Sequence, residues 1–143
     1  MPGVASLQAQ RYYAHTRNAF WGITGELFGF DPAAPYDHRV AVLTAAGVAV
    51  WDVLRHCRRA GSLDSAVEPD SMVPNDFAAF FADHPAITHV YFNGAAAEKN
   101  YGRLVTAPAT VSYTRLPSTS PAHTMSFDRK LAAWRQITAA VRA

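Results

Sequence analysis

The stretch ITHVYFNG, residues 87–94, indicates the fold of this chain more clearly than any other. Its β-branched and aromatic residues form a short apolar run that ends on glycine, which is typical of a buried strand. Residues 95–101 follow at once with a helical pattern, and TVSYTRL, residues 110–116, predicts the next strand. Because alternating strands and helices favour a parallel sheet, we expect an α/β fold.

The apolar pattern predicts further elements before this unit. Helices are expected over 17–29 and 37–46, because each segment is apolar at helical spacing and ends near a glycine. Residues 48–54, VAVWDVL, predict a buried strand. Asn75 is the expected cap of a helix over 76–83.

The last predicted helix begins after Ser126, a capping residue. Apolar residues recur on it at three- and four-residue spacing, which predicts one buried stripe. The stripe consists of Leu131, Trp134, Ile137 and Val141. The basic residues of this helix, Lys130 among them, lie mostly off that stripe.

Composition limits the classes of function. The chain has 143 residues, half of them apolar, which suits one domain with a hydrophobic core. Its formal charge is only +2, so binding of an anion must depend on a local patch. The single cysteine, Cys57, excludes an internal disulfide and a thiolate metal cage. Without a signal-peptide pattern or an apolar run of about 18 residues, a cytoplasmic protein is expected.

Two polar segments follow predicted strands, where ligands bind in parallel α/β sheets. Asn93 ends the first strand, and its amide can donate and accept hydrogen bonds at the edge of a nucleobase. A turn-capping asparagine is the alternative. The loop PSTSPAH, residues 117–123, carries three hydroxyls that can hold phosphate oxygens. An ordinary turn before Ser126 remains equally open for this loop.

The run YYAHTRNAFW, residues 12–21, combines aromatic and polar residues. One tyrosine can stack on a planar ligand, and Asn18 can position a water molecule, although its amide does not titrate. His15 can titrate, but a histidine beside aromatic residues more often packs or donates a hydrogen bond. Phe20 and Trp21 are expected in the core.

The same run resembles the signature that follows the first strand in the uracil-DNA glycosylase superfamily, aromatic-aromatic-x-His-x-x-Asn-x-Phe-Trp. The later motifs GVAVWDVL, FNG and LPSTSPAH are similar to those of one branch, the hypoxanthine-DNA (deoxyinosine) glycosylases. The four motifs occur in the right order and extend over essentially the whole chain. The resemblance implies a three-layer α/β/α fold around a short four-stranded parallel sheet. It also implies monofunctional excision of a deaminated base from double-stranded DNA by base flipping, with hypoxanthine as the leading candidate.

The resemblance assigns roles to residues of this chain. Asn18 matches the asparagine that positions the attacking water, and Tyr13 matches the ring that stacks on the flipped base. Asn93 matches the base-edge contact, and His15 is grouped with it as a base-binding residue. The loop that enters the minor groove and contacts phosphates comprises Pro117, Ser118, Thr119, Ser120, Pro121 and His123. No metal or organic cofactor is expected, and we expect a nucleoid-associated monomer.

The chain departs from its relatives in two places. Most relatives have proline where this chain has Thr16. Relatives also carry a hydrophobic strand and Gly-Ser or Gly-Thr just before the Pro-Gly, where this chain has Met1. We therefore expect a single domain over 1–143 that is N-terminally truncated and lacks its first strand. A start assigned too late is the favoured explanation, and a deliberately shortened protein or a degraded copy are the others.

Two other functions are considered. A catalytically impaired, DNA-binding remnant would bind duplex DNA in a salt-dependent way and release no base. A hydrolase that uses Ser118 or Ser120 with His123 is a third hypothesis. The sequence lacks the G-x-S-x-G nucleophile elbow that would favour it.

Overall fold

The structure, a computed structural model, describes residues 17–51, 54–56, 73–105 and 111–142. Two of the predicted site residues, Tyr13 and His15, lie outside these residues. The same is true of the segment from Met1 to Thr16, where the expected loss of a first strand would be seen. The predictions about these positions therefore stay predictions.

Contacts divide the chain into two compact units. The described residues of Asp52–Leu116 belong to the first unit. Those of Ala5–Trp51 and Pro117–Ala143 belong to the second. The prediction of one domain stays a prediction.

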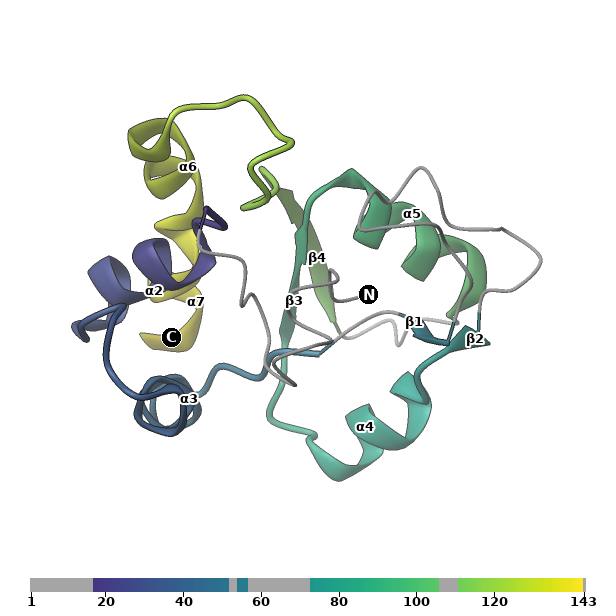
Figure 1. Ribbon diagram of the computed structural model, residues 1–143. Helices are drawn as coiled ribbons and strands as arrows, with labels where there is room; N and C mark the ends of the chain where they lie inside the picture. The colour runs from purple at the N-terminus through teal and green to yellow at the C-terminus, as the bar shows by residue number, and fades with distance from the viewer. Residues whose placement is uncertain (1–16, 52–53, 57–72, 106–110, 143) are drawn as a thin grey trace. The chain divides into compact units, whose positions relative to one another are not determined.

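The first unit contains a parallel pair of strands with a helix between them. Its elements are β1 Leu54–His56, β2 Val73–Pro74, α4 Phe77–Asp83, β3 His89–Asn93, α5 Ala95–Leu104 and β4 Ser112–Leu116. β3 and β4 are parallel neighbours, in register from the pair His89–Ser112 to the pair Asn93–Leu116. α5 connects them along the chain and contacts both (Figure 1). The predicted α/β class is therefore confirmed, whereas the four-stranded count and the three layers stay predictions.

Aromatic rings fill the space between α5 and the parallel strands. The ring centroids of Phe92 and Tyr101 are 5.2 Å apart, and those of Tyr101 and Tyr113 are 5.3 Å apart. The hydroxyls of these two tyrosines are hydrogen-bonded at 3.0 Å. Since Tyr101 is only 4% exposed, this bond satisfies a hydroxyl that would otherwise be buried without a partner. The cluster holds α5 on one face of the strand pair.

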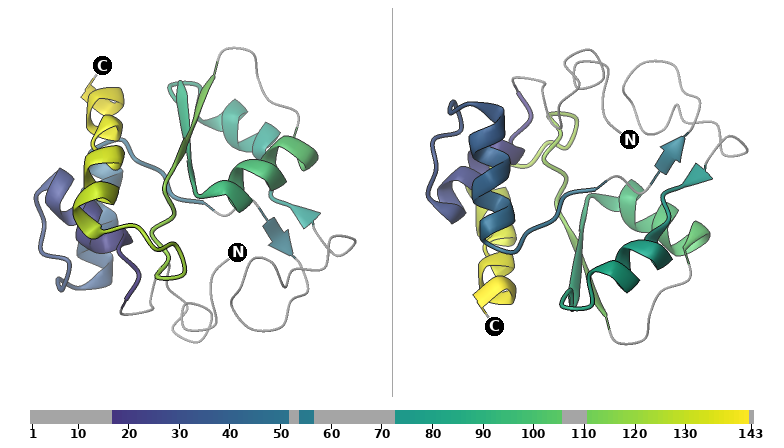
Figure 2. Two further views of the ribbon diagram at one scale, coloured as in Figure 1. Left: turned by 90° about the horizontal axis from the view of Figure 1, so that it is seen from above. Right: turned by 90° about the horizontal axis from the view of Figure 1, so that it is seen from below.

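The second unit consists of helices. Its elements are α2 Phe20–Phe28, α3 Tyr36–Ala45, α6 Phe127–Trp134 and α7 Gln136–Arg142. α2 contacts both α3 and α6, and α7 continues in roughly the direction of α6 (Figure 2). α2 ends where predicted, because Gly29 adopts a left-handed conformation with φ of 80°.

The core of the second unit is aromatic, as predicted for Phe20 and Trp21. Their rings meet edge to face with centroids 4.9 Å apart, and Phe20 also meets Trp134 of α6 at 6.0 Å. Ile23 is fully buried beside them in α2, and Ile137 of α7 is 6% exposed. The two faces of α2 and α6 thus bury one another's apolar side chains.

Three local predictions need correction. Residues 48–51 form no strand, and β1 is limited to Leu54–His56, where it pairs with β2 in an antiparallel and irregular way. The cap of α4 is Asp76, whose carboxylate accepts the amide of Ala79 at 3.0 Å, and not Asn75. The last predicted helix is two helices, α6 and α7, separated by Arg135.

Candidate functional site

Asn93 lies at the carboxyl end of β3, as the sequence predicted. It is half-buried and pairs with Leu116, the last residue of β4. The next residue, Gly94, has φ of 94°, and its amide donates to the carbonyl of Leu116 at 3.0 Å. A residue with a side chain rarely adopts such a φ, so glycine is required at this turn. α5 begins directly afterwards, so Asn93 is next to a helix N-terminus, which favours negative charge.

The loop 117–123 is held in place through its carbonyl oxygens. The indole Nε1 of Trp134 donates to the carbonyl of Pro117 at 2.8 Å. The amide of Ala19 donates to the carbonyl of Thr119 at 2.9 Å. Since Thr119 is itself 1% exposed, the middle of the loop is anchored in the second unit.

A third carbonyl of the loop, that of Ser120, accepts a hydrogen bond from a charged side chain. The Nζ atom of Lys130 donates to the carbonyl of Ser120 at 3.1 Å. Lys130 is 3% exposed, although the sequence placed the basic residues of this helix mostly off the buried stripe. Burial lowers the pKa of its ammonium below the usual 10.5, because the charged form is separated from water.

The two serine hydroxyls of the loop accept hydrogen bonds from amides of the loop itself. Ser118 Oγ accepts the amide of Ser120 at 3.1 Å, and Ser120 Oγ accepts the amide of Ala122 at 3.2 Å. Within the described part of the chain, the amide of Ser118 donates no hydrogen bond. The carbonyls of Pro117, Thr119 and Ser120 are thus occupied, and the Ser118 amide is a donor that a phosphate oxygen can accept.

These contacts also bear on the hydrolase hypothesis. In the described residues, the exposed side chain of His123 makes no hydrogen bond to the hydroxyl of Ser118 or of Ser120. A serine nucleophile needs a base within hydrogen-bond reach. The arrangement of this loop therefore gives no support to a serine hydrolase.

Asn18 lies at the start of α2, just before its first residues. Its Oδ1 accepts the amide of Phe20 at 3.0 Å, and the side chain is partly buried. This bond satisfies one of the free amides at the helix start and fixes the orientation of the side chain. A carbonyl oxygen has two lone pairs, so Oδ1 can accept a second hydrogen bond, and the NH₂ group remains a donor.

Two of the predicted site segments belong to the same unit. Asn18 and the loop 117–123 lie in the same unit, joined by the hydrogen bond from Ala19 to Thr119. Asn93 lies in the other unit. Sequence reasoning missed the two residues that support the loop, Lys130 and Trp134. Their spacing of four residues on one helix was the signal that could have identified a shared face.

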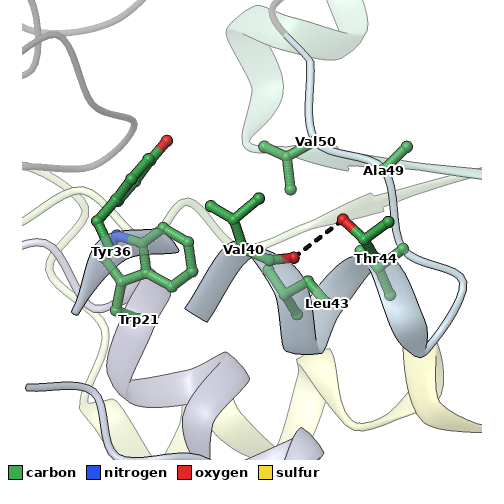
Figure 3. A pocket seen from close by; sticks show the side chains of 8 residues that line it. Trp21, Tyr36, Val40, Leu43, Thr44, Ala49 and Val50 are labelled. Carbon is green, nitrogen blue, oxygen red and sulfur yellow. Dashed lines mark hydrogen bonds between the residues drawn. The ribbon is translucent and has the colours of Figure 1, made fainter. Parts of the chain in front are cut away.

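A hollow in the second unit has none of the predicted site residues in its lining (Figure 3). Its volume is about 260 Å³. Its lining residues are Trp21, Tyr36, Val40, Leu43, Thr44, Val48, Ala49 and Val50. The hydroxyl of Thr44 is occupied by the carbonyl of Val40 at 2.9 Å, so the wall offers little polar chemistry. We therefore do not assign the site to this hollow.

The described residues contain neither a metal-ligand cluster nor a membrane-spanning helix. Among them, histidine, cysteine, aspartate and glutamate form no group of three or more that could ligate a metal. In the same residues, every helix is too short or too polar to cross a membrane.

Comparison with known proteins places this fold in a class. No family model matches the chain. A solution NMR structure from Methanosarcina acetivorans, described as a candidate uracil DNA glycosylase, aligns with 99% of this chain and 86% of its own at a TM-score of 0.82 and 25% identity. The fold is therefore that of a uracil-DNA glycosylase-like protein.

Curated relatives narrow the class. A hypoxanthine DNA glycosylase of Methanosarcina barkeri (strain Fusaro) is 30% identical over 95 residues, which are 66% of this chain and 59% of that protein. A second hypoxanthine DNA glycosylase, from Methanosarcina acetivorans, is 29% identical over 98 residues, 68% of this chain and 61% of that protein. The resemblance to the hypoxanthine-DNA glycosylase branch of the uracil-DNA glycosylase superfamily is thus confirmed. The chain spans about three fifths of the length of these relatives.

Proposed function

We propose that this protein is a monofunctional DNA glycosylase that excises a deaminated base from duplex DNA, with hypoxanthine as the leading candidate. One observation carries the proposal. Ala19, the residue after Asn18, is hydrogen-bonded to Thr119 of the loop 117–123 in one unit, in a chain whose curated relatives are named hypoxanthine DNA glycosylases. The same relatives make DNA the expected partner.

In the proposed reaction, water attacks the sugar carbon C1′ as the bond from C1′ to the base breaks. The bonding electrons leave with the base, which takes up a proton, and an abasic site remains. Positive charge develops on the sugar and negative charge on the base, so fixed donors near the base lower the barrier. The role proposed for Asn93 is that of such a donor, and the role proposed for Asn18, whose Oδ1 has a second lone pair, is to hold the water.

The lesion must leave the base stack to reach these groups, at a cost of a few kcal/mol that is lowest for a weakly paired base. The proposed roles of Tyr13 and His15 are stacking on the flipped base and contacting it. The loop 117–123 would hold the phosphates beside the lesion. Its inward hydrogen bonds keep it rigid, so that little conformational entropy is lost on binding.

The test is excision from a fluorescent duplex that contains one inosine. The full product of the gene is incubated with the duplex, which is then heated in alkali so that abasic sites become strand breaks. We expect breaks at the inosine and none in a duplex with adenine at that position. Asn93→Ala should slow excision, because it removes the proposed contact to the base edge. A variant with both Asn18 and Asn93 replaced by alanine, purified in the same way, is the control for contaminating enzymes.

The alternative function has its own outcome in this assay. A protein that binds the duplex in a salt-dependent way but leaves both inosine and uracil duplexes intact is a DNA-binding remnant, and the enzyme proposal is then wrong.

A further inference from the structure

The structure contains a buried cation that the proposed reaction does not use. Lys130 is 3% exposed, and its Nζ has one hydrogen bond, to the carbonyl of Ser120 at 3.1 Å. Within the described residues, no carboxylate pairs with it. Separating an ammonium from water costs several kcal/mol unless an opposite charge compensates. A buried lysine without a counterion is therefore an indication that an anion binds nearby.

The surroundings of Lys130 suggest which anion. The only described partner of its ammonium is the Ser120 carbonyl in the loop 117–123. The Pro117 and Thr119 carbonyls of this loop also accept hydrogen bonds, and its Ser118 amide donates none in the described part of the chain. An ammonium beneath such a loop attracts a group that accepts hydrogen bonds and carries negative charge. A phosphate of the DNA backbone has both properties.

We propose that Lys130 is the positioning residue of the phosphate site on the loop 117–123. Through the carbonyl of Ser120 it fixes the shape of the loop, and its charge is neutralised by the DNA phosphate that the loop binds. The inference rests on the proposed binding of DNA by this loop, and it adds a residue and a charge to that site.

Only two lysines occur in the chain, Lys99 and Lys130, which allows a test on the unaltered protein. Lysine labelled with ¹³C at Cε should give two resonances, assigned with the variant Lys99→Arg. We expect an undamaged duplex at low salt to shift the Lys130 resonance saturably and to leave that of the exposed Lys99 in place. An unshifted Lys130 resonance, at duplex concentrations that saturate binding by fluorescence anisotropy, would overturn the inference.

Variants then separate charge from structural support. Lys130→Met should weaken duplex binding roughly tenfold and reduce the slope of log K against log salt by about 1, since one phosphate is no longer neutralised. Lys130→Arg should restore the slope. The control is Arg135→Met, which removes an exposed charge just beyond the end of α6. It should change the affinity by no more than about twofold and leave the salt slope unchanged.

The outcomes are distinguishable from failure of the proposed function. With an inosine duplex, Lys130→Met should raise KM and leave the rate at saturation within about threefold, because Lys130 contacts no reacting atom. An unchanged salt slope in a folded Lys130→Met variant overturns the inference even if excision is normal. A wild-type protein that binds duplex through Lys130 but releases no base refutes the glycosylase reaction and retains the inference. A protein that binds no duplex overturns both.

Discussion

Asn18 has two separable roles in this structure, and substitutions can measure each. Its Oδ1 accepts the amide of Phe20 at 3.0 Å, which is a structural role at the start of α2. The proposed role in water positioning uses the second lone pair of the same atom. Asn18→Ala removes both roles, whereas Asn18→Asp keeps an oxygen in the same place.

The structural role is small. Loss of the bond leaves a helix-start amide without its protein partner, at a cost of about 1 kcal/mol. For a chain of this length that corresponds to a fall in Tm of roughly 2–5 °C. With a total stability of about 5–15 kcal/mol, the folded fraction at 25 °C changes by less than about 1%. Destabilisation by Asn18→Ala therefore cannot produce a large loss of activity by itself.

The proposed catalytic role is larger. Removing one fixed hydrogen-bonding group from a reaction centre typically costs a factor of about 10²–10³ in rate. We expect Asn18→Ala to lose that factor in single-turnover excision of inosine. Asn18→Asp should retain at least roughly a tenth of the wild-type rate, since the acceptor for water remains. Its Tm should equal or exceed that of wild type, because a carboxylate is favourable at a helix N-terminus.

The assay pairs thermal unfolding, followed by circular dichroism, with single-turnover excision at saturating protein. If Asn18→Ala loses stability but keeps its rate within about threefold, Asn18 is only a helix-start residue and the catalytic reasoning is refuted. If Asn18→Asp is as unstable as Asn18→Ala, the hydrogen bond to Phe20 contributes nothing measurable.

Three further predictions concern stability and the loop. Trp134→Phe keeps an aromatic ring in the core but removes the donor to the Pro117 carbonyl. We therefore expect the free energy of unfolding, measured in urea, to fall by about 1 kcal/mol and duplex binding to weaken. Unchanged binding would contradict the role of that bond. Gly25→Ala places a Cβ atom 2.7 Å from the carbonyl oxygen of Phe30, so we expect the free energy of unfolding to fall by about 1–3 kcal/mol. The control is Gly102→Ala, because Gly102 has open space around it. Burial, and then the hydrogen bond with Tyr113, raise the pKa of Tyr101 well above its usual 10.0. The folded state therefore keeps a proton that the unfolded state loses, so the free energy of unfolding should fall above pH about 10, and an equally steep fall in Tyr101→Phe would show that other groups cause it.

Much of the fold could be predicted from local pattern. The strands β3 and β4 and the helix between them follow from two short apolar runs around a helical segment. Ser126 caps α6 as predicted, and its Oγ accepts the amide of Arg129 at 3.3 Å. In each case the signal is local, because propensity, a cap and a glycine stop act within a few residues. Residues 48–51 show the limit, since an apolar run alone does not decide whether a neighbouring strand will pair with it.

Candidate site residues were predicted unevenly for the same reason. The position of Asn93 at the end of its strand was predicted correctly, because a strand followed by glycine can be recognised in the sequence. The supports of the loop were missed, because a lysine in an amphipathic helix ordinarily faces solvent.

By itself the sequence determined the α/β class, the helices around Phe20 and Trp134, and the motifs that resemble hypoxanthine-DNA glycosylases. Only the tertiary structure decided that Lys130 is buried and that its ammonium holds the carbonyl of Ser120. The two residues are ten positions apart, and the chain between them forms the loop and the start of α6. Whether a side chain off the apolar stripe meets water or protein depends on what folds over it, which no local pattern contains.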